Sequence, residues 1–314
     1  MKVTALAGGV GGAKLANGLA NILPTECFSV VVNTGDDFYY SQLLVCPDID
    51  TVTYTLAGIN DPVNGWGIKN DTRQVLTALE KLGHPVWFSL GDRDIATHIE
   101  RTRLISQGYS LTEATAVLAR KLKVDHTILP MSDSTVRTLV DTQEFGVISF
   151  QEYFVRYHFQ PKVNRVIFEG AEKAILGHKL QNAILSSDLI IICPSNPFVS
   201  IDPILSIPGL KDLLREKVLI GVSPLIGGNT VKGPAAKMMV EMELQPNSYN
   251  IAKHYGDLLT GFVLDSVDHH DAVQIGRCGI IPLETEILMP NKTAQVRLAK
   301  EVLDFGHNLL SKDH

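Results

Sequence analysis

Acidic side chains occur at three points of this 314-residue sequence where an apolar segment gives way to glycine or small polar residues. Asp36 and Asp37 end the first of these loops, which also contains Asn33 and Thr34. Adjacent carboxylates beside a phosphate site repel each other unless a divalent cation lies between them. We therefore predict that Asp36 and Asp37 hold a metal ion and that Asn33 and Thr34 contact a phosphate. The alternative is a solvated Asx turn.

A glycine-rich loop precedes this acidic loop. The run Gly8-Gly9-Val10-Gly11-Gly12 lies between a short apolar segment and a helical pattern that contains Lys14. Glycines let the backbone approach a bulky anion, and the first N–H groups of a helix are donors for it. We predict that Gly9, Gly11, Gly12 and Lys14 bind a diphosphate. Position 14 is not glycine and position 15 carries no hydroxyl, so neither the dinucleotide fingerprint nor the Walker motif fits. A turn kept only for close strand–helix contact is the alternative.

Two further polar positions are expected near the same sheet edge. Asp50 stands in Cys46-Pro-Asp-Ile-Asp-Thr, just before a β-branched segment, where it could equally cap a helix. Ser89 lies in Trp87–Asp94, which we interpret as another strand end, although a helix beginning at its acidic residues is an equal alternative. Carboxyl ends of parallel strands meet at one edge, so Asp50 and Ser89 are expected near Asp36.

Later loops offer weaker candidates. A strongly apolar run ends in Pro194-Ser-Asn-Pro, which predicts a rigid loop that presents Asn196 to a base or ribose. A second apolar run leads into a Gly227-Gly-Asn loop, in which Gly228 and Asn229 are candidates for the same nucleotide. A plain connector is the alternative for this second loop.

The elements that must position these residues alternate between strands and helices. A strand, a helix and a second strand fit into the first 32 residues, and nearly continuous Val, Ile and Leu runs are typical of parallel strands covered on both faces. The predicted fold is a Rossmann-like, doubly wound, mostly parallel α/β sheet with an additional helical lobe. We expect a single domain over residues 1–314 with a helical insertion over roughly residues 95–165.

Composition excludes several classes of function. The formal charge of -6 and the pI near 5.9 provide no general basic surface for nucleic acid. The four cysteines are far apart, which favours reduced thiols over a disulfide framework or a zinc site. No segment has the roughly 18 apolar residues of a membrane span, nor does the start resemble a signal peptide. A cytoplasmic protein is expected.

Taken together, the motifs resemble the 2-phospho-L-lactate transferase family of deazaflavin-coenzyme biosynthesis. The resemblance is carried by Val3–Lys14, Asn33–Asp37, Cys46–Thr51, Trp87–His98 and Pro194–Pro197, and it covers most of the chain. It implies a Rossmann-like fold, Mg²⁺ dependence and usually a homodimer. It also implies transfer of the phospholactyl group of lactyl-2-diphospho-5'-guanosine to the terminal ribityl hydroxyl of the deazaflavin Fo, which yields GMP and the coenzyme precursor F-420-0.

The resemblance also assigns roles. Asp50 and Ser89 match the family's contacts with Fo, and we hypothesise Asp50 as hydrogen-bond acceptor or base and Asp36 as a catalytic metal ligand. The donor could carry phospholactate or phosphoenolpyruvate, and the base, metal count and oligomeric state stay open. A non-catalytic nucleotide-sugar-binding regulator of the related gluconeogenesis-factor family is the main alternative. A nicotinamide oxidoreductase is a second alternative, disfavoured by Lys14 at the third glycine position.

Overall fold

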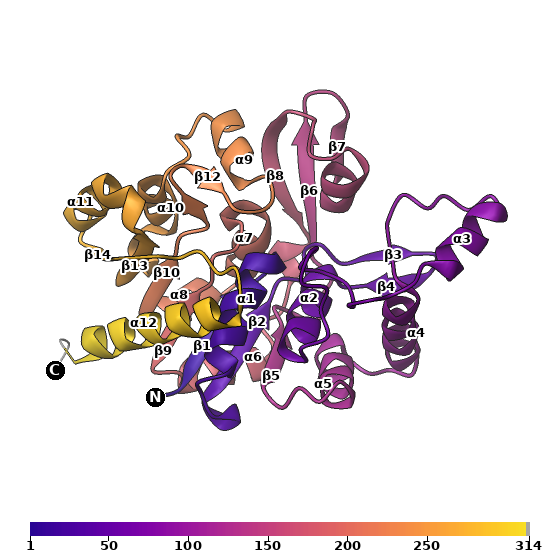
Figure 1. The fold of residues 1–314 in the computed structure, drawn as a ribbon, viewed down its shortest axis with the longest axis horizontal. Coiled ribbons are helices and arrows are strands. Elements are labelled where there is room, and N and C mark those ends of the chain that lie inside the picture. The colour runs from indigo at the N-terminus through magenta and orange to yellow at the C-terminus, as the bar shows by residue number, and fades with distance from the viewer. Residues whose placement is uncertain (312–314) are drawn as a thin grey trace.

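A seven-stranded sheet forms the centre of the computed structural model, which describes residues 1–311 (Figure 1). The strand order is β14-β13-β10-β9-β1-β2-β5, and every neighbouring pair is parallel. From β1 the chain first builds outward through β2 and β5, and it then returns to place β9 on the other side of β1. This doubly wound, Rossmann-like arrangement confirms the predicted fold class. Ligands of such sheets bind where the winding reverses, here between β1 and β9.

Helices cover both faces because the central strands bury side chains in both directions. All five residues of β1 are buried, and its alternate side chains belong to two different apolar clusters. Leu6 contributes to the cluster beneath α6, α8, α10 and α11, whereas Val3 and Ala5 contribute to the cluster beneath α1, α2 and α12. The continuous apolar runs of the sequence thus correspond to strands sealed on two sides.

The bounds of the elements are as follows. The central strands are β1 (Val3–Ala7), β2 (Phe28–Val32), β5 (Thr127–Pro130), β9 (Leu189–Ile192), β10 (Val218–Val222), β13 (Gly261–Asp265) and β14 (Ile281–Thr285). The smaller sheets contain β3 (Phe38–Tyr40), β4 (Leu43–Val45), β6 (Arg137–Thr142), β7 (Gly146–Ser149), β8 (Val163–Glu169), β11 (Leu225–Ile226) and β12 (Asn229–Thr230). The helices are α1 (Gly9–Ala20), α2 (Pro47–Leu56), α3 (Gln74–Lys81), α4 (Asp92–Ser106), α5 (Leu111–Lys121), α6 (His178–Ser186), α7 (Asp202–Leu205), α8 (Leu210–Arg215), α9 (Ala235–Glu241), α10 (Ser248–Tyr255), α11 (His269–Arg277) and α12 (Lys292–Leu310).

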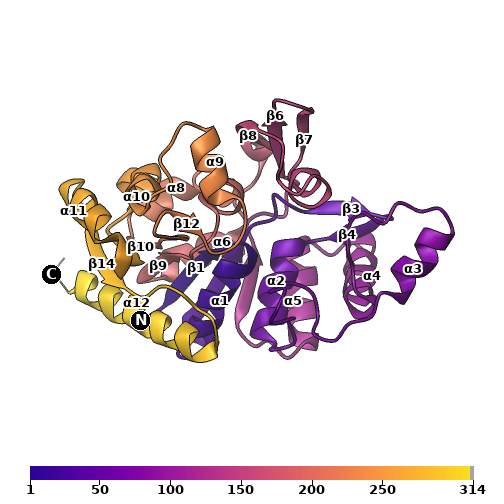
Figure 2. The ribbon, with the colours of Figure 1, turned by 45° about the horizontal axis from the view of Figure 1, so that its top comes forward.

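A lobe built from β3, β4, α3 and α4 extends beyond the β5 edge of the sheet (Figure 2). Its small core combines aliphatic side chains with aromatic rings, among which the partly buried Phe38 and Phe88 meet edge to face with centroids 4.8 Å apart. Trp87 packs against both Phe38 and Phe88. The strand expected over Trp87–Asp94 is therefore wrong: Trp87 and Phe88 fill the core of the lobe, and α4 begins at Asp92. The alternative of a helix N-terminus is confirmed.

The expected helical insertion over residues 95–165 is also wrong in part. This stretch contains α4 and α5, but it contributes β5 to the central sheet as well. From Arg137 onward the chain forms an antiparallel sheet in the order β7-β6-β8, whose last strand ends at Glu169. Alternation of buried and exposed residues along β6 explains this sheet, since only one face packs against the core.

None of the helices in residues 1–311 combines the length and apolar character that crossing a bilayer requires.

Candidate active site

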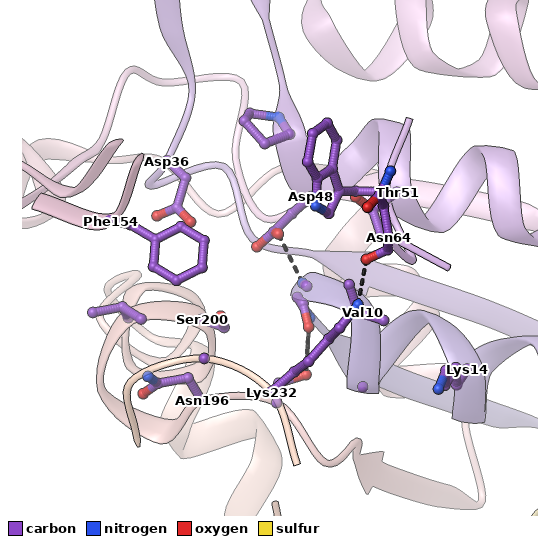
Figure 3. A pocket seen from close by; sticks show the side chains of 18 of the residues that line it. Val10, Lys14, Asp36, Asp48, Thr51, Asn64, Phe154, Asn196, Ser200 and Lys232 are labelled. Atoms are coloured by element: carbon purple, nitrogen blue, oxygen red, sulfur yellow. Dashed lines mark hydrogen bonds between the residues drawn. The ribbon is translucent and has the colours of Figure 1, made fainter. Parts of the chain in front are cut away.

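A pocket of about 630 Å³ lies at the carboxyl edge of the sheet, where β1 and β9 diverge. The start of α1, the first turns of α2, the loop after β9 and the loop after β10 all line it, and the lobe closes one side. Of the residues singled out from the sequence, the following line the pocket: Gly9, Gly11, Lys14, Asp36, Asp50, Ser89 and Asn196. Figure 3 shows Asp36 and Asn196 on two sides of this space, with Lys14 farther along α1.

The glycine loop lies close to the loop after β9, and two of its predicted phosphate-binding residues, Gly9 and Gly11, line the pocket. Helix α1 begins at Gly9, whose φ of 61° lies in the left-handed region, and its N-cap residue Gly8 has no side chain to cap it. A Cβ at Gly11 would lie 2.2 Å from the Pro194 carbonyl oxygen, and one at Gly12 would lie 2.4 Å from the Ser195 Oγ. Gly12 therefore allows close contact between α1 and the loop after β9 and does not line the pocket, which corrects its expected placement.

Asp36 and Asp48 form a buried pair of carboxyl groups that face the pocket (Figure 3). Burial, and then the charge of Asp48, raise the pKa of Asp36 well above its ordinary value. Burial raises the pKa of Asp48 to about 6, against the opposing effect of hydrogen bonds from Asn33 and Gly9. Those bonds measure 2.9 Å from Asn33 Nδ2 and 2.7 Å from the Gly9 N–H. Both groups would gain from a nearby cation.

Other residues of the Asn33–Asp37 loop hold the Asp36–Asp48 pair in place on the side away from the pocket. Asn33 is fully buried, and besides Asp48 its side chain contacts the Val199 carbonyl (3.2 Å) and the Gly35 N–H (2.8 Å). Asn33, Thr34 and Asp37 do not line the pocket, contrary to expectation. The loop turns at this point, with the Asp37 N–H donating to the Thr34 carbonyl, so Asp36 and Asp37 point in different directions. The carboxylate beside Asp36 is thus Asp48, which the sequence analysis did not single out.

Asp50 has a different environment, although it lies only two residues after Asp48. It belongs to the first turn of α2, whose N-cap is Cys46, so Asp50 is not the cap. Both of its carboxylate oxygens accept hydrogen bonds from the Arg101 guanidinium, with Nη1 at 3.1 Å from Oδ2 and Nη2 bonded to Oδ1. Burial by itself would lower the pKa of Arg101, but the charge of Asp50 more than offsets this and raises it.

Helix α4 brings two more groups to Asp50. His98 Nδ1 lies 3.5 Å from Asp50 Oδ2 and 3.2 Å from Arg101 Nη1. On its other side, His98 Nε2 lies 3.4 Å from Asp94 Oδ1, which also accepts a 2.7 Å hydrogen bond from the Tyr54 hydroxyl. The sequence analysis singled out neither Arg101 nor His98 as a site residue. The spacing of Asp94, His98 and Arg101, which share one face of a helix, is the signal that could have found them.

The remaining candidates divide between the pocket and its surroundings. Ser89 lines the lobe side of the pocket and Asn196 the opposite side, where the Asn196 Oδ1 also accepts the Phe198 N–H at 3.0 Å. Gly228 and Asn229 do not line the pocket, which corrects their expected placement. They belong to the tight turn between β11 and β12, in which Asn229 Nδ2 donates to the Gly227 carbonyl.

A second lysine reaches the pocket from the loop after β12. Lys232 Nζ lies 3.4 Å from the Val63 carbonyl oxygen and also donates to the Asn64 carbonyl, so it ties this loop to the loop before the lobe (Figure 3). Burial, and next the charge of Lys232, lower the pKa of Lys14. Two cationic side chains therefore line the pocket beside the start of α1, a combination that favours a multiply charged anion.

Comparison with known proteins identifies the family. A family model described as 2-phospho-L-lactate transferase CofD matches residues 3–275. The chain belongs to this CofD family. The curated relatives are named as transferases, and this chain matches them over nearly their whole length. The protein is therefore a transferase. The chain is 42% identical over 298 residues to a 2-phospho-L-lactate transferase of Methanosarcina acetivorans, a match that covers 95% of this chain and 97% of that one.

Other relatives are named phosphoenolpyruvate transferase, and their identity to this chain is only slightly lower. A phosphoenolpyruvate transferase of Streptomyces griseus is 37% identical and is matched over 98% of this chain and 99% of its own length. Among solved structures, a UPF0052-family protein of Bacillus halodurans superposes with a TM-score of 0.63 at 14% identity, covering 96% of this chain and 98% of that chain. At that identity the likeness shows the Rossmann-like fold alone.

Proposed function

We propose that this CofD-family transferase moves the phospholactyl group of lactyl-2-diphospho-5'-guanosine to the terminal ribityl hydroxyl of the deazaflavin Fo. The observation that carries this proposal is the meeting of two unlike surfaces in one pocket. The start of α1, Lys14, Lys232 and the Asp36–Asp48 pair suit a metal-bound diphosphate, whereas Asp50 suits an alcohol. Phosphoryl transfer depends mainly on bringing such groups into line and neutralising charge.

The reaction balances as a displacement at phosphorus. The acceptor hydroxyl oxygen forms a new bond to the phosphorus that carries the lactyl ester, and the bond from this phosphorus to the bridging oxygen breaks. GMP leaves with that oxygen and its electron pair, and the hydroxyl proton departs by way of the carboxylate that accepts its hydrogen bond, then to water. Lys14 and Lys232 would stabilise the charge that develops on the leaving phosphate.

The donor set of the pocket fits the Mg²⁺ that the family resemblance implies. Asp36 and Asp48 supply carboxylate oxygens, which are the ligands Mg²⁺ prefers. Within residues 1–311 no protein group forms a hydrogen bond with the buried Asp36 Oδ1, so this atom remains free for a ligand. A bound Mg²⁺ would offset part of the negative charge of the diphosphate and the two carboxylates. We assign the metal to Asp36 and Asp48, in place of the Asp36–Asp37 pair expected from the sequence.

The acceptor is assigned to the side of the pocket formed by α2 and the lobe. Asp50 and Ser89 would hold the ribityl hydroxyls, and Trp66, Phe88 and Leu90 provide apolar surface for a flat ring system. Relatives are named for both phospholactate and phosphoenolpyruvate, and these two donors differ by only two hydrogens. We propose phospholactate, because four relatives that are 39–42% identical to this chain carry that name.

A mass-spectrometric assay tests the proposal. The purified protein is incubated with Fo and Mg²⁺, and with either the lactyl or the enolpyruvyl donor, beside a control without metal. We expect the phospholactyl product and an equal amount of GMP with the lactyl donor, and little of either without Mg²⁺. Preference for the enolpyruvyl donor would overturn the donor assignment. Nucleotide binding without product would favour the regulator alternative. Sedimentation of the same sample tests the expected homodimer.

A further inference from the structure

The Asp50 carboxylate is held from behind by a cation that does not itself line the pocket. Arg101 is only 1% exposed, and its guanidinium uses two nitrogens on the two oxygens of Asp50. Such a two-point contact fixes the plane of the carboxylate as well as its position. The lone pairs that Asp50 turns toward the pocket are therefore fixed in direction before any substrate binds.

The contact between Arg101 and His98 determines the tautomer of the histidine. A guanidinium can only donate hydrogen bonds, so the His98 Nδ1 that lies 3.2 Å from Arg101 Nη1 must be the acceptor. The ring proton of a neutral His98 is then on Nε2, on the side of Asp94. His98, which also lines the pocket, thus keeps the Arg101 guanidinium turned toward Asp50.

Helix α4 is attached to the neighbouring hairpin as well. Arg101 Nη1 lies 3.3 Å from the Leu44 carbonyl oxygen, and the Leu44 N–H donates to the Thr102 hydroxyl at 2.8 Å. Arg101 is therefore anchored by the lobe, whereas Asp50 belongs to α2 beside the central sheet. At the pocket wall, this ion pair and the hydrogen bond from Tyr54 to Asp94 both join the lobe to α2.

Stability of the fold alone does not explain why these four polar side chains are buried together. Burying two carboxyl groups, a guanidinium and an imidazole carries a large desolvation cost, and apolar side chains of similar volume are often as stable or more stable. In the described part of the chain, the buried Arg101 Nε and His98 Nε2 atoms also have no hydrogen-bond partner. Such costs are tolerated where a site needs a group held in a fixed direction.

We propose that Arg101 and His98 are positioning residues, which act through Asp50 to orient the hydroxyl of the acceptor substrate. The inference rests on the proposed function, since it assumes that an alcohol binds at Asp50. It assigns no contact with the substrate to Arg101. If so, the lobe, through α4, determines how the acceptor hydroxyl is oriented, and it does not influence donor binding.

Steady-state kinetics of the full-length enzyme test the proposal with matched variants. Arg101→Met removes the cation, and Arg101→Lys keeps the charge but loses the two-point contact. His98→Leu removes the acceptor for Arg101, whereas His98→Asn keeps an acceptor oxygen near the position of Nδ1. Arg103→Met is the control, because Arg103 lies on the same helix and forms an exposed ion pair with Glu100.

We expect Arg101→Met and His98→Leu to lower kcat/KM for the acceptor by about tenfold or more, the factor that losing a hydrogen bond to a charged group produces. The donor KM should change by less than about twofold in both variants. His98→Asn should recover most of the loss, Arg101→Lys only part of it, and Arg103→Met should behave like the wild type. In an Asp50→Asn background, His98→Leu should have little further effect, because its action passes through Asp50.

Equal losses for donor and acceptor, or a His98→Leu effect that persists unchanged beside Asp50→Asn, would overturn the proposal. Thermal unfolding of each variant separates these results from loss of folding, and the His98 pair supplies the test if Arg101→Met does not fold. Failure of the proposed function is a different result, since the wild-type enzyme would then form no product from Fo with either donor.

Discussion

Asp36 and Asp48 line the pocket beside α1, whereas Asp50 lines it beside the lobe, and the two sides treat the same kind of side chain differently. On the α1 side, burial raises the pKa values of both carboxyl groups, and no cationic side chain bonds to either of them in residues 1–311. On the lobe side, Arg101 compensates the charge of Asp50 within the protein. The charges of Asp36 and Asp48 therefore need a bound ligand to balance them, whereas the charge of Asp50 is balanced by Arg101 before any ligand binds.

This difference has a structural origin. Asp36 follows the end of β2 and Asp48 begins α2, so both lie at the edge of the sheet, where the α1 N–H groups and two lysines favour anions and metal-bound phosphates. The lobe side contains side chains from a long helix, which can supply a counter-ion at a fixed spacing. We infer that charge on one side of the pocket is balanced by ligands and on the other by the fold.

The largest expected effect is on stability, from Asp50→Ala. The substitution leaves Arg101 buried without its partner, and breaking a buried pair in this way costs about 3–5 kcal/mol. Denaturant unfolding without ligands measures the change. Asp36→Ala is the matched variant on the other side of the pocket, and it should not reduce the free energy of unfolding by a comparable amount. Equal destabilisation by both variants would remove the distinction between the two sides.

The next effect is on activity, from Asp36→Asn. Losing a metal and phosphate contact at the reacting group should lower kcat by about 10²–10³-fold, while thermal stability stays the same or rises because a buried charge is removed. Asp37→Asn is the control, and we expect less than about tenfold loss there because Asp37 does not line the pocket. A larger loss from Asp37→Asn, with a changed Mg²⁺ response, would restore the metal pair expected from the sequence.

A third effect concerns pH. The pKa of Asp48 is raised from 3.8 to about 6 on folding, so the folded protein binds this proton more tightly than the unfolded chain does. Stability without metal is therefore lost as pH rises from about 4 to about 7. Asp48→Asn, which cannot ionise, should gain stability relative to wild type over this window, by up to about 3 kcal/mol. Thermal unfolding at several pH values measures the difference. A difference that is constant with pH would contradict the assignment.

Saturating Mg²⁺ sharpens the same measurement. A cation bound between Asp36 and Asp48 stabilises their ionised forms, so it should raise the melting temperature of the wild-type protein more at pH 7 than at pH 5. The metal should have little effect on Asp48→Asn.

The smallest expected effect comes from Lys232→Met. Removing one of two cations should raise the donor KM by about three- to tenfold and weaken its dependence on salt, with little change in the acceptor KM. Lys253→Met, at an exposed position of α10, is the control. If the acceptor KM rises instead, Lys232 belongs with the lobe side through its contacts with the loop at Val63 and Asn64.

The fold class and the donor side were largely predictable from local patterns. Continuous apolar runs predicted β1, β2 and β9, and the glycine run predicted a strand, loop and helix, because these features depend on residues close together in sequence. The acidic loop at Asp36 was placed correctly at the sheet edge, whereas Asp48, the other carboxyl group that lines the pocket there, was not singled out. The direction of a side chain within a turn depends on the backbone path, so Asp48 could not be preferred over Asp37 from spacing alone.

The sequence by itself therefore determined the parallel α/β class, the strand–helix–strand start of the chain and the places of the glycine and acidic loops at the sheet edge. Only the tertiary structure decided how the charges pair. Asp50 and Arg101 are 51 residues apart, and they meet because the apolar core of the lobe positions α4, which carries Arg101. Likewise, Gly12 contacts Ser195 only after the crossover from β5 to β9. Local patterns set the backbone, whereas pairing between distant side chains depends on packing that no short segment encodes.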